Sequence, residues 1–252
     1  MSEHIQVSSK NRIMTIHLNR ADHLNAMTTK SAYAIRQAWE QFNASDDLVA
    51  VITGRDEAFT AGADVQDLAD PTSEGWEIHQ CIPGLLVEVE KPIVSAVAGW
   101  CVGAGLYMVQ ATDLIVAAEN AKFVYPEAKM GMGGSWVPTG TATRLPMKIA
   151  MELALVGEPI SAQRAYDVGM VNAVVEVGQQ TEKAYEYAEK IAANAPASIR
   201  QMKRHLLDFG PQVQADLISH MPDRLAAGKV PGDKREGVAA FREGRKPIFE
   251  GH

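Results

Sequence analysis

The sequence predicts an α/β fold that ends in an entirely helical region. Segments with the patterns of strands and helices alternate along residues 1 to about 195. The connections between these segments are short, which favours parallel strand pairing and a buried sheet. From residue 196 onward the pattern is helical and is interrupted by prolines. We therefore expect a core over residues 1–195 and a helical region over residues 196–252.

The expected strands are short runs of apolar or alternating residues bounded by turn residues. The first, "RIMTIHL", alternates between apolar and polar side chains and ends before Asn19. The others are more continuously apolar, which is typical of strands buried on both faces of a sheet. The five expected strands cover residues 12–18, 48–53, 92–99, 113–119 and 171–177.

The expected helices begin at residues whose side chains can accept hydrogen bonds from the first amides of a helix. Thr28 or Thr29 precedes a run that ends at about Ala44, and Asp64 and Ser161 precede shorter runs. Further helices are expected between residues 75 and 90 (with an interruption at residues 83–84), at residues 104–111, at residues 147–157, and from residue 181 almost to the end of the chain.

Composition and charge narrow the class of protein. The chain has 252 residues, of which 46% are hydrophobic and 22% are charged, as in ordinary globular proteins. We see no apolar run of about 18 residues that could span a membrane and no secretory signal. Cys81 and Cys101 form no metal-binding or redox motif. We read them as reduced thiols and expect a cytoplasmic protein.

The charge is unevenly distributed. The whole chain carries a net charge of −7, which argues against a general nucleic-acid-binding protein. From residue 195 to the end there are ten Lys or Arg and seven Asp or Glu, a net of +3. We interpret this basic region as a solvated helical surface. The alternatives are that it meets a phosphate group or an acidic neighbouring subunit, or that the protein is structural or associated with nucleic acid.

Two similar turns of small residues are the main functional signal. "FTAGAD" at residues 59–64 and "CVGAGL" at residues 101–106 both lead from a strand into a helix. Such turns can expose unpaired backbone amides, and two converging amides can stabilise an oxyanion. Each turn alone is explained by tight packing. The occurrence of both in one chain favours the oxyanion site.

Other chemistries that use such motifs are excluded by the residues around them. A dinucleotide-binding loop needs a third glycine where Met108 stands, and a nucleotide P-loop needs a Gly-Lys-Ser/Thr sequence, which is absent. "GGSWV" lacks the final glycine of a nucleophile elbow. The seven histidines have no metal-pair spacing, so we expect no metal site.

Five segments that span nearly the whole chain, in order, resemble the signatures of the enoyl-CoA hydratase/isomerase (crotonase) family. The resemblance implies a spiral of repeated ββα units, a C-terminal helical region that mediates trimer formation, and an acyl-CoA thioester as substrate. It also implies a homotrimer or a hexamer made of two trimers. CoA is part of the substrate, and no further cofactor is implied. The segments are "LNRADHLNAM", "VITGRDEAFTAGADVQDL", "KPIVSAVAGWCVGAGLYMVQATDLIVAAENAKFVYPEAKMGM", "ISAQRAYDVGMVNAVV" and "EGVAAFREGRKPIF".

The same resemblance assigns the catalytic groups. It places the two oxyanion-hole donors on the backbone amides of Ala63 and Ala104. Family hydratases have two glutamates that face the substrate; one matches Glu127, and the other falls at Tyr107. Alanine at 104, where glycine is usual, keeps the amide provided that its φ is negative. For Tyr107 we favour shaping and packing of the pocket over direct chemistry.

Further positions are expected to contact the substrate. The loop around residue 24 resembles the adenine-binding loop of the family. Phe241 matches a C-terminal aromatic residue that often reaches the ligand of another subunit. Ser135 is best explained as a loop-capping hydroxyl, Trp136 as a wall of the acyl pocket and Asp64 as a helix cap. The expected substrate-binding set is His23, Leu24, Ala26, Ala61, Asp64, Val65, Gly103, Tyr107, Ser135, Trp136 and Phe241.

The predicted activity is enolate chemistry on an enoyl-CoA, with one glutamate as proton shuttle. A single carboxylate suffices to move a proton between two carbons, whereas the addition of water is harder to explain with one carboxylate. We therefore favour isomerisation of 3-enoyl-CoA to 2-enoyl-CoA. The alternatives are an enoyl-CoA hydratase, an altered acyl-CoA hydrolase, and a non-catalytic acyl-CoA-binding protein. We expect neither a nucleic acid nor a membrane as partner.

Overall fold

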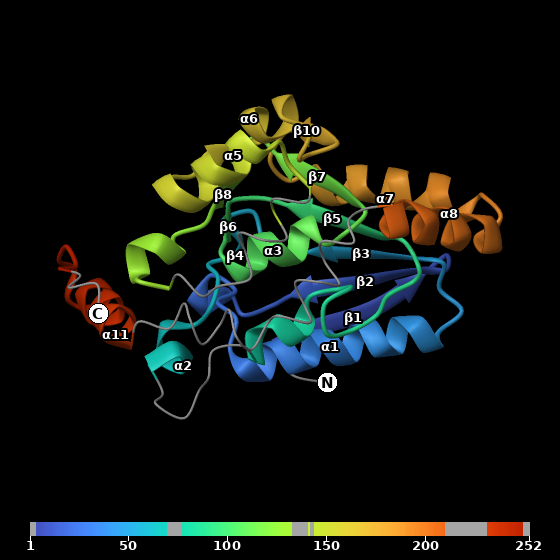
Figure 1. Cartoon of the computed structure of the whole chain (residues 1–252). Helices are drawn as coiled ribbons and strands as arrows, with labels where there is room; N and C mark the ends of the chain where they lie inside the picture. The colour runs from blue at the N-terminus through green and yellow to red at the C-terminus, as the bar shows by residue number, and fades with distance from the viewer. Residues whose placement is uncertain (1–3, 70–76, 133–140, 142–143, 210–230, 249–252) are drawn as a thin grey trace.

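Two β-sheets form the frame of the protein (Figure 1). The computed structural model describes residues 4–69, 77–132, 141, 144–209 and 231–248. Within them the larger sheet has the order β1-β2-β3-β5-β7-β10 and the smaller β4-β6-β8-β9. All neighbouring strands pair in parallel except β1 with β2 and β8 with β9. The strands are β1 (Ile5–Lys10), β2 (Ile13–Leu18), β3 (Val49–Thr53), β4 (Ala58–Thr60), β5 (Ile93–Val97), β6 (Trp100–Val102), β7 (Leu114–Ala118), β8 (Lys122–Val124), β9 (Ile160–Ser161) and β10 (Ala173–Val175).

The chain passes from one sheet to the other in a repeated order. Strands β3, β5 and β7 lie in the larger sheet, and the strand after each one, β4, β6 or β8, lies in the smaller sheet. A helical segment follows each pair: α2, α3 or η3. This order is the predicted spiral of ββα units. The helical segments are η1 (Ala21–His23), α1 (Thr29–Ala44), α2 (Val65–Ala69), η2 (Glu77–Cys81), α3 (Ala104–Gln110), η3 (Glu127–Met130), α5 (Met147–Met151), the π-helical turn η4 (Glu152–Val156), α6 (Ala162–Asp167), α7 (Gln180–Ala192), α8 (Pro196–Phe209) and α11 (Pro231–Glu243).

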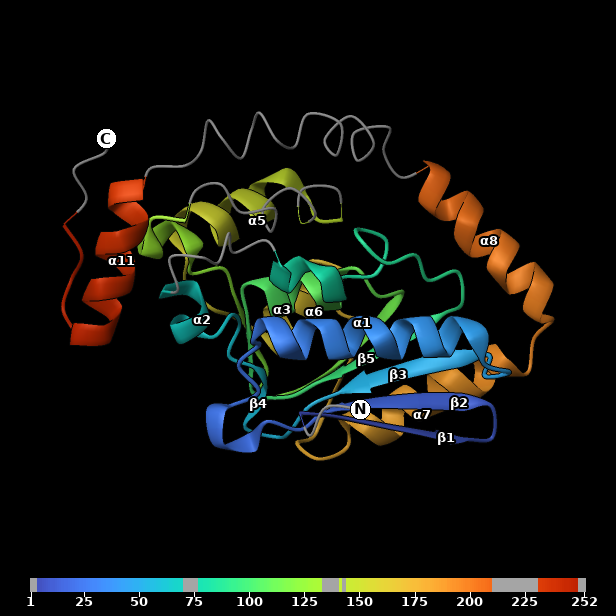
Figure 2. The same ribbon diagram turned by 90° about the horizontal axis from the view of Figure 1, so that it is seen from below.

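The larger sheet is buried on both faces. Because side chains alternate along a strand, Val49 and Val51 of β3 join the cluster that packs against α7, whereas Ala50 and Ile52 join the cluster that includes α1. The two helices therefore cover opposite faces (Figure 2). This double burial explains why the middle strands are continuously apolar in sequence.

The first strand of the larger sheet was not expected from the sequence. β1 pairs with β2 through a hairpin whose two turn residues, Asn11 and Arg12, have φ values of 53° and 61°. Two consecutive left-handed residues are typical of the tight turns that join antiparallel strands. Most side chains of β1 are exposed, so its sequence "IQVSSK" lacks the apolar pattern of a buried strand.

The helix expected between residues 75 and 90 is wrong in its extent. The described part of this segment forms only the short 3-10 helix η2, followed by turns. Gly84 has a φ of +75°, and its amide donates to the carbonyl of Val87 over 2.8 Å. Pro83 and Gly84 therefore end the helical conformation rather than interrupt it.

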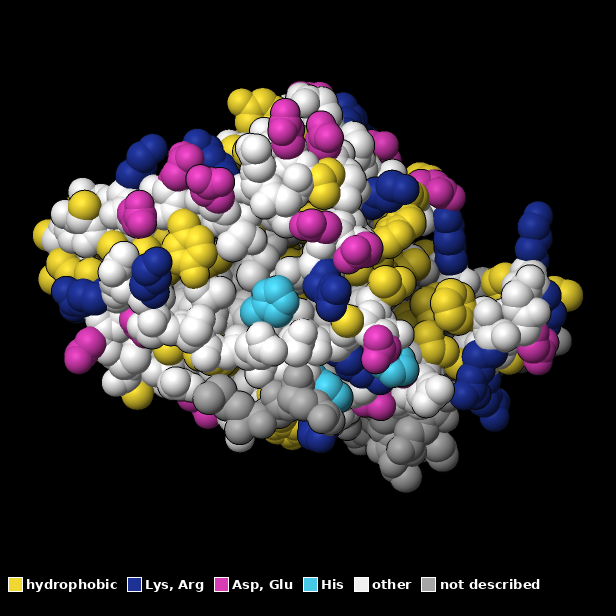
Figure 3. Space-filling model, turned by 180° about the vertical axis from the view of Figure 1, so that it is seen from behind, with side chains coloured by type: hydrophobic (Ala, Val, Ile, Leu, Met, Phe, Trp, Pro, Cys, Tyr) yellow, Lys and Arg dark blue, Asp and Glu magenta, His cyan; other side chains and the backbone are white. Residues whose placement is uncertain are grey.

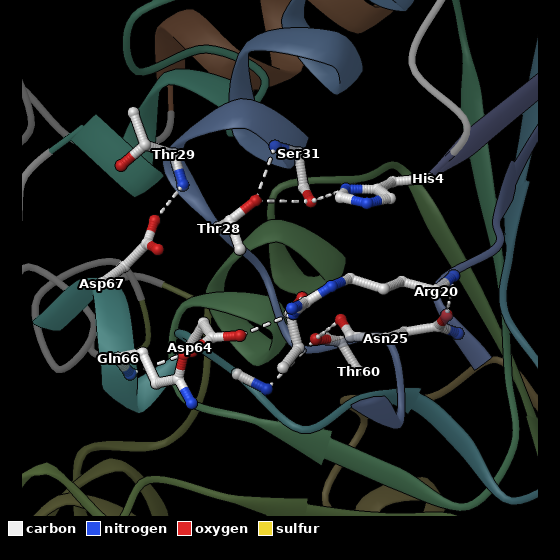
Figure 4. Close-up of polar contacts among 12 residues, drawn as sticks. His4, Arg20, Asn25, Thr28, Thr29, Ser31, Thr60, Asp64, Gln66 and Asp67 are labelled. Carbon is white, nitrogen blue, oxygen red and sulfur yellow. Dashed lines mark hydrogen bonds and ion pairs between the residues drawn. The ribbon is translucent and has the colours of Figure 1, made fainter. Parts of the chain in front are cut away.

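The expected helix caps are confirmed. The Thr28 hydroxyl accepts from the amide of Ser31 at the start of α1 (Figure 4), and the Ser161 hydroxyl accepts from the amide of Arg164 at the start of α6. Asp64 Oδ1 accepts from the amide of Gln66 at the start of α2. Each cap satisfies an amide that has no acceptor within its own helix.

The described C-terminal helices α8 and α11 lie at opposite ends of the molecule (Figures 1 and 2). Both begin at prolines, Pro196 and Pro231, as the sequence predicts. Lys203 of α8 pairs with Asp113 over 2.8 Å, and Arg245 beyond α11 pairs with Glu236. These basic residues are thus neutralised within the chain, and Lys and Arg are interspersed with Asp and Glu on the face in Figure 3. The division at residue 195 stays a prediction.

One glycine contact holds α3 against β4. A methyl group on Gly105 would lie 2.0 Å from Cγ2 of Thr60. We expect Gly105→Ala to lower the free energy of unfolding by about 1–3 kcal/mol, the usual cost of overpacking, as measured by urea denaturation. Thr60→Ser removes the clashing methyl but keeps the hydroxyl, so it should restore most of the loss in the double variant. An equal loss in both backgrounds would contradict this contact.

Candidate active site

Three short parallel strands bring the predicted catalytic groups to one edge of the smaller sheet. β6 pairs in parallel with β4 on one side and with β8 on the other. The carboxyl ends of parallel strands point to the same edge. Ala63 follows β4, Ala104 follows β6 and Glu127 follows β8. Parallel pairing therefore gathers three segments that are far apart in sequence.

The amide of Ala63 faces away from the segment that supports it. Met27 donates from its amide to the carbonyl of Gly62 over 2.7 Å and accepts at its carbonyl from the amide of Asp64 over 2.8 Å. In such a parallel bridge the residue between the two bonded positions, Ala63, directs its own N–H to the opposite side. No described residue accepts a hydrogen bond from this amide. It is available to a ligand.

The amide of Ala104 is the first of helix α3. Gly103 precedes it with φ of +55° and ψ of −122°, and its amide donates to the carbonyl of Val124 in β8 over 2.9 Å. The first amides of a helix have no acceptor within the helix, and no side chain caps this one. Ala104 itself is helical and has no positive φ. The condition under which alanine can replace glycine here is therefore met.

Glu127 lies directly against Gly103. A methyl group on Gly103 would lie 2.7 Å from Oε1 of Glu127, and the φ of +55° at this position favours glycine. The other oxygen, Oε2, is buried and has no hydrogen-bond partner. Burial raises the pKa of Glu127 from its ordinary 4.5 to about 7, against the lowering effect of a backbone hydrogen bond. A buried carboxyl group with an unpaired oxygen and a near-neutral pKa is typical of a proton-transfer residue.

Tyr107 is buried one helical turn after Gly103, and its amide donates to the carbonyl of Gly103 over 3.1 Å. Burial raises the pKa of the Tyr107 phenol, and the nearby Arg144 guanidinium acts in the opposite direction. The phenol is therefore neutral at neutral pH. The amides of Ala63 and Ala104 can only donate hydrogen bonds. Of the described groups at this edge, Glu127 is therefore the one that can accept a proton.

A buried polar network beneath α3 was missed in the sequence. The Tyr125 hydroxyl donates to Oε1 of Gln110 over 2.9 Å, and the Thr141 hydroxyl donates to the same oxygen over 2.8 Å. Gln110 lies three residues after Tyr107, so it is close to the same helix face. Helical spacing alone could have placed Gln110 near the site, but its partners come from segments that only the tertiary structure brings together.

The predicted adenine-binding loop lies beside the Ala63 turn. Leu24 has a φ of 48°, and its carbonyl accepts from the amide of Ala61 over 2.9 Å. The Leu24 side chain is exposed, as is His23, while Ala26 is half-buried. The structure thus brings His23, Leu24 and Ala26 close to the Ala61–Ala63 turn. Their contact with a substrate stays a prediction.

Asp64 and Val65 mark the start of α2, directly after Ala63. Both carboxylate oxygens of Asp64 are engaged by the protein: Oδ1 accepts from the amide of Gln66, and Oδ2 accepts from Arg20 over 2.6 Å. The sequence analysis found the cap but missed Arg20. The two residues are 44 positions apart, and no local pattern links them.

Of the remaining predicted residues, Phe241 is the one that the structure describes. Phe241 is on α11 with 63% of its surface exposed. α11 packs closely against η3 of the same chain. A methyl group on Gly237 of α11 would lie only 2.2 Å from the carbonyl oxygen of Met130 in η3. Ser135 and Trp136 lie outside the described residues.

The described residues hold no group of three or more His, Cys, Asp or Glu that could bind a metal ion. No described helix is both long and apolar enough to cross a membrane. Cys81 and Cys101 are free and buried, and burial raises the pKa of the Cys81 thiol to about 12. Neither thiol is therefore primed as a nucleophile.

The model of the enoyl-CoA hydratase/isomerase family matches residues 8–252. The chain therefore belongs to this family and is an enzyme of it. The mevalonyl-coenzyme A hydratase sidH of Aspergillus fumigatus is 35% identical over 93% of this chain and 90% of its own length. The (E)-benzylidenesuccinyl-CoA hydratase of Thauera aromatica is 32% identical over 98% of this chain and 99% of its own.

Solved structures show the same fold. A carnitinyl-CoA hydratase from Mycobacterium avium superposes with a TM-score of 0.87 at 29% identity, with complete coverage of both chains. A methylmalonyl-CoA decarboxylase superposes with a TM-score of 0.86 at 27% identity, also with complete coverage. The predicted crotonase-like α/β spiral is thus confirmed. The two names differ in reaction, so the frame itself does not determine the chemistry.

The burial of the Glu127 carboxyl group leads us to predict a pH dependence of the free energy of unfolding. A carboxyl group whose pKa is raised in the folded state binds its proton more tightly there than in the unfolded chain. Its contribution to stability is therefore lost as the pH rises from about 4.5 through about 7. Glu127→Gln should be more stable than the wild type at pH 8, by at most about 3 kcal/mol at 1.36 kcal/mol per pKa unit.

Urea denaturation at pH 5 and pH 8 measures this difference, which should be much smaller at pH 5. Glu57→Gln is a matched control, because it makes the same chemical change at an exposed position. If Glu127→Gln gave the same change in stability at both pH values, the carboxyl group would not be buried as described.

Proposed function

We propose that the protein binds an acyl-CoA thioester and transfers a proton on the thioester enolate, with Glu127 as the single acid–base group. The observation that carries this proposal is the position of the Glu127 carboxyl group against Gly103, beside the first amide of α3. Its pKa of about 7 suits both steps of a proton shuttle, because the group can accept and return a proton near neutral pH.

In the proposed mechanism the thioester carbonyl oxygen accepts hydrogen bonds from the amides of Ala63 and Ala104. The two donors stabilise the negative charge that develops on this oxygen when the α-proton leaves. Ionised Glu127 takes the α-proton of a 3-enoyl-CoA and forms the conjugated enolate. The protonated acid then gives the proton to the γ-carbon, which yields the 2-enoyl-CoA. No atom is lost, and Glu127 returns to its ionised form.

Tyr107 is the reason to favour isomerisation. A neutral buried phenol does not supply the second carboxylate that would polarise water. Hydration or dehydration is the second candidate, favoured by the names of the relatives, which are hydratases of mevalonyl-CoA and benzylidenesuccinyl-CoA. A syn addition or elimination needs only one acid–base group when water itself is well placed. The two reactions share the same enolate and the same use of Glu127.

We also propose assembly into a trimer or a hexamer through residues 196–252. Exposed apolar side chains on α8 support this proposal: Met202, Leu206 and Leu207 are 61%, 76% and 54% exposed. Apolar patches of this kind are typical of interaction surfaces. Localisation in the cytoplasm and the absence of a cofactor other than the CoA of the substrate remain predictions.

The proposed reaction is tested by supplying 3-enoyl-CoA, 2-enoyl-CoA and 3-hydroxyacyl-CoA thioesters separately and following the products by chromatography. We expect conversion of 3-enoyl-CoA to 2-enoyl-CoA, with kcat/KM rising with pH up to about 7 and constant above it, because the base must be ionised. Glu127→Gln should lower kcat by at least about 10³-fold. Turnover of only the 2-enoyl and 3-hydroxyacyl thioesters would establish the second candidate instead.

Tyr107→Phe separates packing from chemistry at this position. The substitution keeps the ring that fills the buried space and removes only the hydroxyl. If Tyr107 shapes the pocket, kcat should stay within about 3-fold of the wild type and the pH profile should be unchanged. A loss on the scale of general acid–base catalysis, about 10²-fold or more, would show that the hydroxyl takes part in the reaction.

A further inference from the structure

We infer that Arg20 and Asp64 form a positioning pair that fixes the amide of Ala63 in the oxyanion site. The inference rests on the proposed role of Ala63. Neither side chain is assigned a contact with the reacting atoms; the pair acts through the backbone between residues 61 and 64. The pair also ties this turn to the loop at residues 20–27, which is the predicted adenine-binding loop.

The Arg20 guanidinium holds both segments at once. Nη1 donates to Oδ2 of Asp64 over 2.6 Å (Figure 4). The same nitrogen donates to the carbonyl of Ala26 over 2.9 Å. The two side chains are 17% and 12% exposed, so the pair is shielded from water. Arg20 is itself fixed, because its amide donates to the side-chain oxygen of Asn25 over 2.8 Å.

Backbone hydrogen bonds join the loop at residues 20–27 to the turn at residues 61–64, but among the described residues none of them is made by the N–H of Ala63. Ala61 bonds to Leu24, Gly62 and Asp64 bond to Met27, and no described backbone contact holds the N–H of Ala63 itself. Gly62, just before Ala63, has a φ of +87°. Glycine restricts the backbone less than any other residue, so the turn is not made rigid at this position. The direction of the Ala63 amide therefore depends on the positions of its two neighbours. Asp64 is held from its side chain as well as from its backbone.

The Asp64 carboxylate keeps its charge near neutral pH. Burial favours the neutral form of Asp64, but the hydrogen bonds from Arg20 and from the Gln66 amide outweigh it and lower the pKa of the carboxyl group. An oxyanion donor acts only when it is aimed at the developing charge, and a misplacement of about 1 Å costs on the order of 10²-fold in rate. A small rotation of the turn would thus lower the rate without removing any substrate contact.

The substitutions can separate the ion pair from the helix cap. In Asp64→Asn, the side-chain oxygen can still accept from Gln66, and asparagine is a good cap. Its NH₂ group then faces Arg20, so the second bond is lost. Arg20→Gln removes the pair from the other side, and the double variant completes the cycle. Lys183→Gln is the matched control, because it breaks an exposed ion pair on α7 that is unconnected with the site.

The readout is the ultraviolet absorption of bound cinnamoyl-CoA, which shifts to longer wavelength when donors polarise its thioester carbonyl. We expect a red shift with the wild type and with Lys183→Gln. Asp64→Asn and Arg20→Gln should bind the probe within about 3-fold of the wild type with a clearly smaller shift, and kcat should fall about 10- to 100-fold. The double variant should be no worse than the poorer single variant.

Two outcomes overturn the inference, and they are distinguishable. If the wild type shifts the probe and both variants shift it equally, the pair does not position the amide, and the proposed function stands. If the wild type binds the probe without any shift, the oxyanion site itself is wrong, and the inference fails with it. Circular dichroism of each variant at the assay temperature shows whether the chain is folded during the measurement.

Discussion

The arrangement of the site depends on the parallel pairing of three strands of only three residues each. β4, β6 and β8 would be too short to form a stable sheet alone. They are held because each follows a five-residue strand of the larger sheet, which is buried between α1 and α7. The large sheet therefore supplies most of the buried apolar surface, and the small sheet uses that support to align the three segments that follow its strands.

This support allows the fold to tolerate an unfavourable group. Glu127 is half-buried, but its Oε2 is buried without a hydrogen-bond partner, which would normally destabilise a protein. The same burial raises its pKa to about 7 and makes it able to give and take a proton. Stability and acid–base function are thus opposed at one residue. Gly103 favours the arrangement because it adopts a positive φ without strain and has no side chain beside the Glu127 carboxyl group.

The sequence could predict the parts of the fold that leave either a long apolar run or a pattern among neighbouring residues. The five-residue strands β3, β5 and β7 are continuous apolar runs, and the caps of α1 and α6 depend on residues within three positions. The short strands β4, β6 and β8 were not assigned because three residues are too few for a period. β1 was missed because it is largely exposed, and η2 was predicted too long because a proline and a glycine end it.

The features of the candidate site also divide into those that the sequence could predict and those that it could not. The small-residue turns around Ala63 and Ala104 could be recognised because backbone amides need only a particular loop conformation. The partners of Gln110 and of Asp64 could not, because they come from distant segments. This division has a consequence for the chemistry. The two backbone amides belong to turns that follow strands of the small sheet, whereas position 107 contributes a side chain of α3. The proposed choice of reaction therefore depends on the side chain at position 107, whereas the two turns and the fold do not depend on it.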